Sequence, residues 1–198
     1  MKDFWNQRYA EDLFAYGTLP NVFFKQELDK LSPGSLLLPA EGEGRNATYA
    51  AGKGWQVSAF DFSAAAMKKA VGLAQNQGVH IDYQVLHVLD FHSDIKFDVL
   101  GLVYAHFPAE IRANAHLHLQ KFLKPNALVI FEAFSKKQIG KSSGGPKNMD
   151  MLFSIDEIHT EFKDLTFDYL EEETVYLQEG EYHQGEASVI RFVGRLAD

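Results

Sequence analysis

Short apolar runs alternate along the chain with longer stretches of helical periodicity. The runs have the length of strands and occupy positions 35–40, 56–60, 81–86, 97–103 and 128–134. Some are apolar on both faces, as in Leu36-Leu37-Leu38, which is typical of parallel strands covered by helices on each side. Between the runs, the sequence predicts helices over 44–53, over 64–77 after the N-cap Ser63, and over 109–122 after Pro108. This alternation indicates βαβ units.

The last third of the chain has a different pattern. Residues 136–153 are rich in Lys, Gly and Ser and are expected to form a mobile loop. Ser154 and Glu157 then provide capping chemistry for a short helix. Segments 167–177 and 187–196 flank a polar stretch at 178–185, which predicts an antiparallel hairpin with a long tip. We therefore expect an α/β fold with a seven-stranded mixed sheet, helices on both faces and a C-terminal antiparallel hairpin.

No linker or internal repeat divides the chain, so one domain over residues 1–198 is expected. Within it we expect a helical N-terminal lid or cap, a ligand-binding core, the mobile loop, and a final helix with the hairpin. Their ranges are 1–30, 35–135, 136–153 and 154–198.

Charge and composition narrow the class of partner. The chain carries 27 acidic and 19 basic residues, a net charge of -8, with no basic block, which argues against nucleic acid or an anionic membrane and favours a small molecule. It has no cysteine, so disulfides, thiolate metal sites and catalysis through an enzyme thiol are excluded. The first ten residues lack the apolar core of a secretory signal, and no apolar stretch approaches a membrane span. A cytoplasmic protein, monomeric or weakly dimeric, is expected.

A glycine turn after the first strand is the strongest candidate for chemistry. The strand runs into Glu41-Gly42-Glu43-Gly44 and then into a helix, whose unpaired N–H groups can receive a polar ligand. The second strand ends at Asp61, 17 residues after Gly44 (61 minus 44), close to the spacing of about 20 at which an acidic residue meets a ribose in nucleotide-binding folds. No third glycine follows, however, and Glu41 with Glu43 would repel a pyrophosphate, so a cationic ligand is favoured.

At these positions the chain resembles the class I S-adenosylmethionine-dependent methyltransferases. Residues 36–46 (LLLPAEGEGRN) look like their first motif, and 60–63 (FDFS) like the acidic motif of their second strand. Residues 89–91, 97–108 and 122–134 resemble the later motifs in the expected order. Phe4-Trp5, Arg8-Tyr9 and the late Glu179-Gly180 resemble, more narrowly, the tellurite-resistance type of small methyltransferase. The resemblance implies a Rossmann-like methyltransferase fold with S-adenosylmethionine as cofactor.

The resemblance also implies roles for individual residues. Leu38 stands where the family usually has an acidic residue and Ala40 where it has the first glycine, so Glu41 is the natural substitute for binding the methionine ammonium. Asp61 would pair with the ribose hydroxyls and Asp90 with the adenine amino group. The remaining expected cofactor contacts are Gly42, Gly44, Asn46, Phe62, Phe91, Val103 and Tyr104.

The acceptor and any general base are expected on loops at the carboxyl edge of the sheet. If the acceptor must lose a proton, His106 is the first choice of base and His183 the second, because imidazole titrates near neutrality. Tyr16 is a further candidate site element, ahead of Trp5. The eight histidines show no helical i, i+4 metal pair, so no metal is expected. Two alternatives stay open: an NAD-type oxidoreductase, and a cofactor-binding regulatory protein without turnover.

Overall fold

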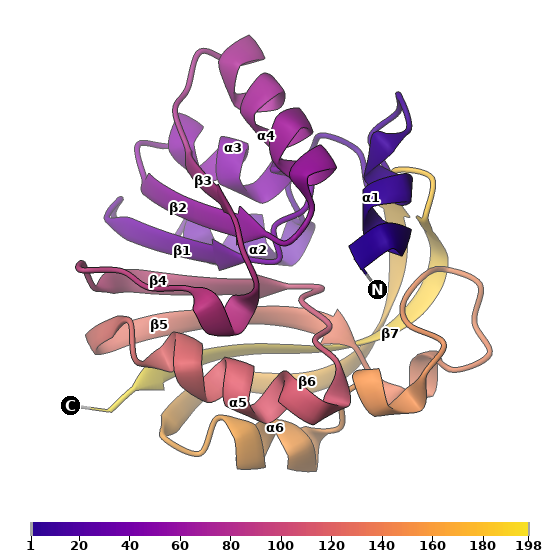
Figure 1. Cartoon of the computed structure of the whole chain (residues 1–198). Coiled ribbons are helices and arrows are strands. Elements are labelled where there is room, and N and C mark those ends of the chain that lie inside the picture. Colours follow the sequence, from indigo (N-terminus) through magenta and orange to yellow (C-terminus); the bar gives the residue numbers. More distant parts are fainter. Residues whose placement is uncertain (1, 198) are drawn as a thin grey trace.

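The computed structural model describes residues 2–197 and is built on a seven-stranded sheet (Figure 1). The strand order is β3-β2-β1-β4-β5-β7-β6. The first five strands are parallel, and β7 pairs antiparallel with both β5 and β6. The strands are β1 (Ser35–Pro39), β2 (Gln56–Asp61), β3 (Asp82–Val85), β4 (Phe97–Val103), β5 (Leu123–Phe134), β6 (Leu165–Glu179) and β7 (His183–Leu196). The predicted mixed sheet with its C-terminal hairpin is confirmed.

Helices cover both faces of this sheet (Figure 1). One face carries α2 (Val22–Leu28), α3 (Arg45–Gly52) and α4 (Ala64–Asn76), and the other carries α5 (Ala109–Gln120) and α6 (Ile155–Glu161). Leu36 and Leu38 pack into the first of these cores and Leu37 into the second, so the apolar triplet of β1 is buried on both sides. No helix among residues 2–197 has the length and apolar character needed to cross a membrane.

The predicted helix starts are present. The Ser63 hydroxyl accepts the Ala66 N–H at 3.2 Å and caps α4. Ser154 and Glu157 form a reciprocal capping box at the start of α6. Before the sheet, α1 (Lys2–Ala10) lies beside α4 and the hairpin formed by β6 and β7 (Figure 1). The caps therefore fix helix ends that the hydrophobic pattern alone places only approximately.

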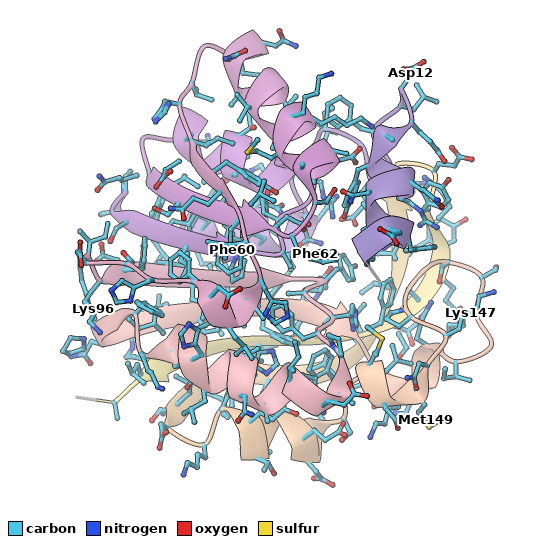
Figure 2. The ribbon with its side chains drawn as sticks, in the orientation of Figure 1. Asp12, Phe60, Phe62, Lys96, Lys147 and Met149 are labelled. Carbon is cyan, nitrogen blue, oxygen red and sulfur yellow. The ribbon has the colours of Figure 1, made fainter. Side chains whose placement is uncertain are left out.

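The hairpin differs from its predicted form, because β6 runs to Glu179 and β7 starts at His183, which leaves a short tip in place of a long one. Residues that the sequence predicts to lie in the loop instead interact with distant parts of the chain. Glu179, for example, forms an ion pair with Arg45. The segment over 136–153 forms two 3-10 turns, η2 (Lys136–Gln138) and η3 (Met149–Met151), and carries Lys147 beside the second one (Figure 2). Two polar residues of this segment, Gln138 and Ser143, are buried. The Gln138 amide donates to the Ser143 hydroxyl at 2.9 Å, and this hydroxyl donates to the Glu186 carbonyl of β7 at 2.6 Å.

Candidate functional site

The turn between β1 and α3 is left-handed at three positions. Ala40, Gly42 and Gly44 have φ values of 51°, 62° and 82°. A Cβ on Gly42 would lie 2.8 Å from the Tyr9 hydroxyl oxygen, and a Cβ on Gly44 would lie 2.5 Å from the Ala70 Cβ in α4. Both glycines are therefore required by close packing as well as by backbone conformation.

Glu41 is used at the start of α3. Its Oε1 accepts the backbone N–H groups of Asn46 at 2.9 Å and Ala47 at 2.8 Å, which satisfies two donors of the first helical turn. Burial raises the pKa of Glu41 to about 7, against the opposing effect of these hydrogen bonds and of the Arg45 charge. Its Oε2 meets only the Asn46 side-chain amide among the contacts of the described residues, at 3.4 Å, so one carboxylate oxygen keeps accepting capacity.

Glu43 fastens the N-terminal segment, a role that sequence reasoning missed. Its carboxylate is buried and accepts the Ala15 N–H at 2.7 Å and the Lys69 ammonium of α4 at 2.8 Å. The residue before the second glycine of the turn thus joins the chain start to the helix that follows β2. The lysine lies 26 residues after Glu43, in a different element, so the sequence offers no signal for this contact.

Asp61 lies buried at the end of β2, as predicted. Its Oδ1 accepts the Ser63 N–H at 2.9 Å and its Oδ2 accepts the Gly42 N–H at 3.3 Å. Burial raises the pKa of Asp61 to about 6, although these backbone hydrogen bonds lower it. Burial raises the pKa of Tyr9, whose hydroxyl lies beside Gly42, and the Asp61 carboxylate raises it further. Asp61 therefore links the glycine turn to the start of α4 and retains free lone pairs.

The other residues expected around an adenine occupy different environments. Asp90 ends the 3-10 turn η1 (Val88–Asp90) after β3 and is exposed. Phe91 is buried in the core, where its ring stacks on Phe60 at 4.9 Å between centroids. Phe62 is half-buried just beyond the end of β2, whereas Phe60 points into the molecule (Figure 2). Asp61, Phe62 and Asp90 thus share the carboxyl edge of the sheet.

The N-terminal segment covers this edge. The rings of Trp5 and Tyr9 stack at 5.4 Å between centroids, and Tyr16 lies 6.4 Å from Trp5. The Ser63 hydroxyl hydrogen-bonds to Asn6 at 2.6 Å, which holds α1 against the start of α4. Aromatic side chains of the first 16 residues therefore lie over the glycine turn.

His183 lies in an aromatic enclosure next to β4 and β5. Its ring centroid is 4.4 Å from that of Tyr16, 4.5 Å from Tyr104 and 5.2 Å from Phe134. Tyr104 follows Val103 at the end of β4 with a φ of 52°. Its hydroxyl is buried near Glu132, whose charge raises the Tyr104 pKa, yet it meets no hydrogen-bond partner of standard geometry among the described residues. The structure brings the candidates His183, Tyr16 and Tyr104 together.

A buried ionic network surrounds this enclosure, and sequence reasoning missed its members. Glu179 accepts hydrogen bonds from Arg45 at 2.9 Å, from Asn21 at 3.1 Å and from His183 Nδ1 at 3.2 Å. Burial opposes ionisation of Glu179, but His183 and Arg45 outweigh it and lower the pKa of Glu179 to about 2. The Asn21 side chain also donates to Glu132 at 2.6 Å. The sequence offered one signal for this network, because Glu132 interrupts the apolar run of β5. In the structure this residue is fully buried.

Arg191 closes the network on the hairpin side. Its guanidinium is paired with Glu132 and, at 2.8 Å, with Glu173 of β6. Asn46 joins the network to the glycine turn, because its side-chain oxygen accepts the Asn21 N–H at 2.9 Å. The residues of the first motif and those of the hairpin are therefore physically connected through Asn21.

His106 is held differently from His183. Its Nδ1 lies 2.8 Å from the Met151 carbonyl oxygen, and its Nε2 accepts the Phe134 N–H at 3.3 Å. Both nitrogens are thus occupied by backbone groups, and burial lowers the pKa of His106 to about 4. No group of three His, Asp or Glu side chains within residues 2–197 is arranged to hold a metal ion.

Comparison with known proteins identifies the fold. Scans of protein-family models and of curated proteins found no match to this chain. A structure from work on the conversion of a disulfide bond into a thioacetal group during echinomycin biosynthesis aligns with a TM-score of 0.76 and 16% identity, over 98% of this chain and 89% of that one. TehB from Haemophilus influenzae aligns with a TM-score of 0.74 and 13% identity, over 98% of this chain, which spans 66% of that one.

A third structure carries a ligand. The N-methyltransferase NodS from Bradyrhizobium japonicum WM9, in complex with S-adenosyl-L-homocysteine, aligns with a TM-score of 0.69 and 15% identity over 100% of this chain and 98% of that chain. At such identities the likeness concerns the fold. The expected Rossmann-like methyltransferase fold is confirmed.

Proposed function

We propose that this protein is an S-adenosylmethionine-dependent methyltransferase that moves a methyl group to a small-molecule acceptor. The observation that carries the proposal is the buried Asp61 carboxylate at the end of β2, held beside the left-handed turn through its hydrogen bond from Gly42. Ligands of such sheets bind beyond the carboxyl ends of the strands, where these groups lie. The fold shared with NodS, which binds S-adenosyl-L-homocysteine, supports the same conclusion.

The residues at this edge fit the cofactor. Each Asp61 oxygen accepts one backbone N–H, so lone pairs are left for two ribose hydroxyls. We assign Asp90 to the adenine amino group and Phe62 with Phe91 to the walls beside the ring. S-adenosylmethionine supplies an activated methyl group, because its positively charged sulfur leaves as a neutral thioether.

The turn and β4 would hold the methionine part. The free capacity of Glu41 Oε2 suits the ammonium group, while Gly42, Gly44 and Asn46 shape the turn. Val103 and Tyr104, at the end of β4, would lie beneath this part of the ligand. The buried carboxylates around the turn favour a cation over a pyrophosphate, which argues against an NAD-type oxidoreductase.

On the acceptor side we propose His183, in place of His106, as the general base. Both nitrogens of His106 are bound to backbone groups, so that residue orders the chain around Met151 and Phe134. His183 uses one nitrogen for Glu179 and lies against Tyr16 and Tyr104. A base with one oriented nitrogen and one available nitrogen has the arrangement that proton transfer needs.

Isothermal titration calorimetry against S-adenosylmethionine, S-adenosylhomocysteine and NAD tests the proposal. We expect the first two ligands to bind and NAD not to bind. Asp61→Ala should weaken S-adenosylhomocysteine at least about tenfold, because each unpaired ribose hydroxyl costs roughly 1–3 kcal/mol. Asp61→Asn keeps the side-chain volume and checks that the loss is not unfolding, and Asp94→Ala, at an exposed loop position, is the matched control. Tight NAD binding, or unchanged affinity in a folded Asp61 variant, would refute the proposal.

A further inference from the structure

We infer that Glu179 is the positioning residue for His183, and that this pair serves an uncharged acceptor with a proton to lose, a thiol. The inference rests on the methyltransferase function proposed above. It starts from the contact between His183 Nδ1 and Glu179 Oε2 at 3.2 Å, within an enclosure where His183 is only 5% exposed.

The contact selects one tautomer of His183. A carboxylate can only accept, so Nδ1 carries the proton and Nε2 carries the lone pair. Nε2 lies beside Gly144, where an added Cβ would come within 3.2 Å of it. Gly144, whose φ is +127°, packs closely against the ring, because an added Cβ would also lie 2.6 Å from His183 Cδ2 and 2.8 Å from the Tyr182 carbonyl oxygen. Among the described residues the only hydrogen bond of the imidazole is the one from Nδ1, so the lone pair of Nε2 is not used by the protein.

Glu179 is built to remain charged and fixed. Asn21, Arg45 and His183 all donate to it, from the segment before α2, from α3 and from β7. A carboxylate held in this way orients the imidazole and stabilises the imidazolium that forms when Nε2 takes a proton. Its neighbours come from three separate elements, so its position does not depend on the hairpin alone.

The charges around His183 disfavour an anionic acceptor such as selenite or tellurite. Arg45 is paired with Glu179, and Arg191 is paired with both Glu132 and Glu173. These three carboxylates outnumber the two guanidinium groups. Arg8 reaches the enclosure through Tyr16, to whose hydroxyl it donates at 3.4 Å, and its guanidinium lies over the Tyr182 ring at 3.7 Å. An enclosure of aromatic rings with paired charges suits an uncharged ligand.

A thiol matches the base better than other uncharged nucleophiles. A thiol has a pKa of about 8.5, against about 6.5 for a free imidazole, and burial lowers the pKa of His183 further, whereas an amine with a pKa near 10 is protonated at neutral pH. In the reaction the acceptor S–H bond breaks and its proton goes to His183 Nε2. The acceptor sulfur then forms a bond to the methyl carbon, and the electron pair of the broken carbon–sulfonium bond stays on the departing sulfur. The products are a methyl thioether, S-adenosylhomocysteine and the proton held by His183, which passes to water.

Nitrogen NMR of histidine-labelled protein, saturated with S-adenosylhomocysteine, tests the positioning role without an acceptor. We expect His183 to show the Nδ1-protonated tautomer in the wild type and a mixture of tautomers in Glu179→Gln. The titratable and charged groups facing His183 are Glu179, Arg45, Glu132 and His106. Burial lowers the pKa of His183 and Glu179 opposes that shift, so the variant should titrate at still lower pH. Glu186→Gln is the matched control, because Glu186 lies on β7 with His183 but is ion-paired with Lys141, and this variant should behave as the wild type. An unchanged tautomer and titration in Glu179→Gln would overturn the positioning role.

Formation of S-adenosylhomocysteine tests the acceptor class. Phenylmethanethiol and dithiothreitol, two thiols that keep their protons at neutral pH, are compared with selenite and butylamine. We expect product with the thiols, a kcat about 100-fold lower in Glu179→Gln with KM within about threefold, and partial rescue in Glu179→Asp. The acid limb of the rate profile should also move to lower pH in Glu179→Gln. Turnover of selenite or butylamine without either thiol, or of none of the four, would overturn the acceptor class. Failure of the wild type to bind S-adenosylhomocysteine would instead refute the proposed function.

Discussion

Gly44→Ala is expected to destabilise the protein by about 2–5 kcal/mol. A left-handed backbone costs a non-glycine residue about 1–2 kcal/mol, and Gly44 has a φ of +82°. The new Cβ would also lie 2.5 Å from the Ala70 Cβ and 2.8 Å from its Cα, and overpacking of this kind costs about 1–3 kcal/mol. The free energy of unfolding is measured by urea titration with circular dichroism.

A second substitution separates the two causes. Ala70→Gly removes the clashing methyl and costs about 2 kcal/mol by itself, from helix propensity and lost burial. Because the Cα of residue 70 still lies 2.8 Å from the new Cβ, the double variant should recover only part of the overpacking cost and be about 1 kcal/mol more stable than the sum of the single effects predicts. Gly78→Ala is the matched control, because Gly78 has a φ of +69° and nothing lies within 4 Å of an added Cβ. If the effects of the two substitutions add within about 0.5 kcal/mol, or if Gly44→Ala and Gly78→Ala cost the same, the contact between Ala70 of α4 and the turn does not cause the destabilisation.

Two further predictions concern pH and the hairpin tip. Glu41 has a folded pKa of about 7 against an ordinary 4.5, so the folded state binds its proton more tightly and wild-type stability should fall as pH rises through that window. Glu41→Gln should remove this part of the pH dependence. The free energy of unfolding is measured by urea titration between pH 4.5 and 7, and the same pH dependence in the wild type and in Glu41→Gln would contradict the prediction. Gly180→Ala would bring a Cβ within 2.5 Å of the Ala15 carbonyl, so proteolysis of the first 20 residues should accelerate, whereas Gly140→Ala, with open space, should not accelerate it.

The hydrophobic pattern was sufficient to predict the parallel strands, because a strand that is buried on both faces appears in the sequence as a continuous apolar run. Leu36, Leu37 and Leu38 are all buried, and the parallel register of β1 follows from that run. The end of β2 at Asp61 and the caps at Ser63 and Ser154 were equally local, since each depends on neighbours within three residues.

The hairpin and the ionic network were not predictable in this way. Glu179 reads as part of a polar loop, but it ends β6 because Arg45 and Asn21, more than 130 residues earlier, donate to it. A polar residue such as Glu179 is expected to be exposed to solvent, but here its carboxylate is part of a buried hydrogen-bond network. His106 and His183 likewise follow similar local patterns, and only tertiary packing gives one of them two backbone partners and the other a carboxylate.

The position of β7 has a consequence for the order of folding. It lies between β5 and β6 in the sheet, although both are made before it on the ribosome. Until β7 has left the ribosome, the apolar strand β5 has an unpaired edge and the 15-residue strand β6 has no partner. Unpaired strand edges of this kind can pair with other chains and cause aggregation. Because β7 also begins with His183, the aromatic enclosure around that residue is incomplete in the nascent chain while this edge is open, and insertion of a single strand completes both.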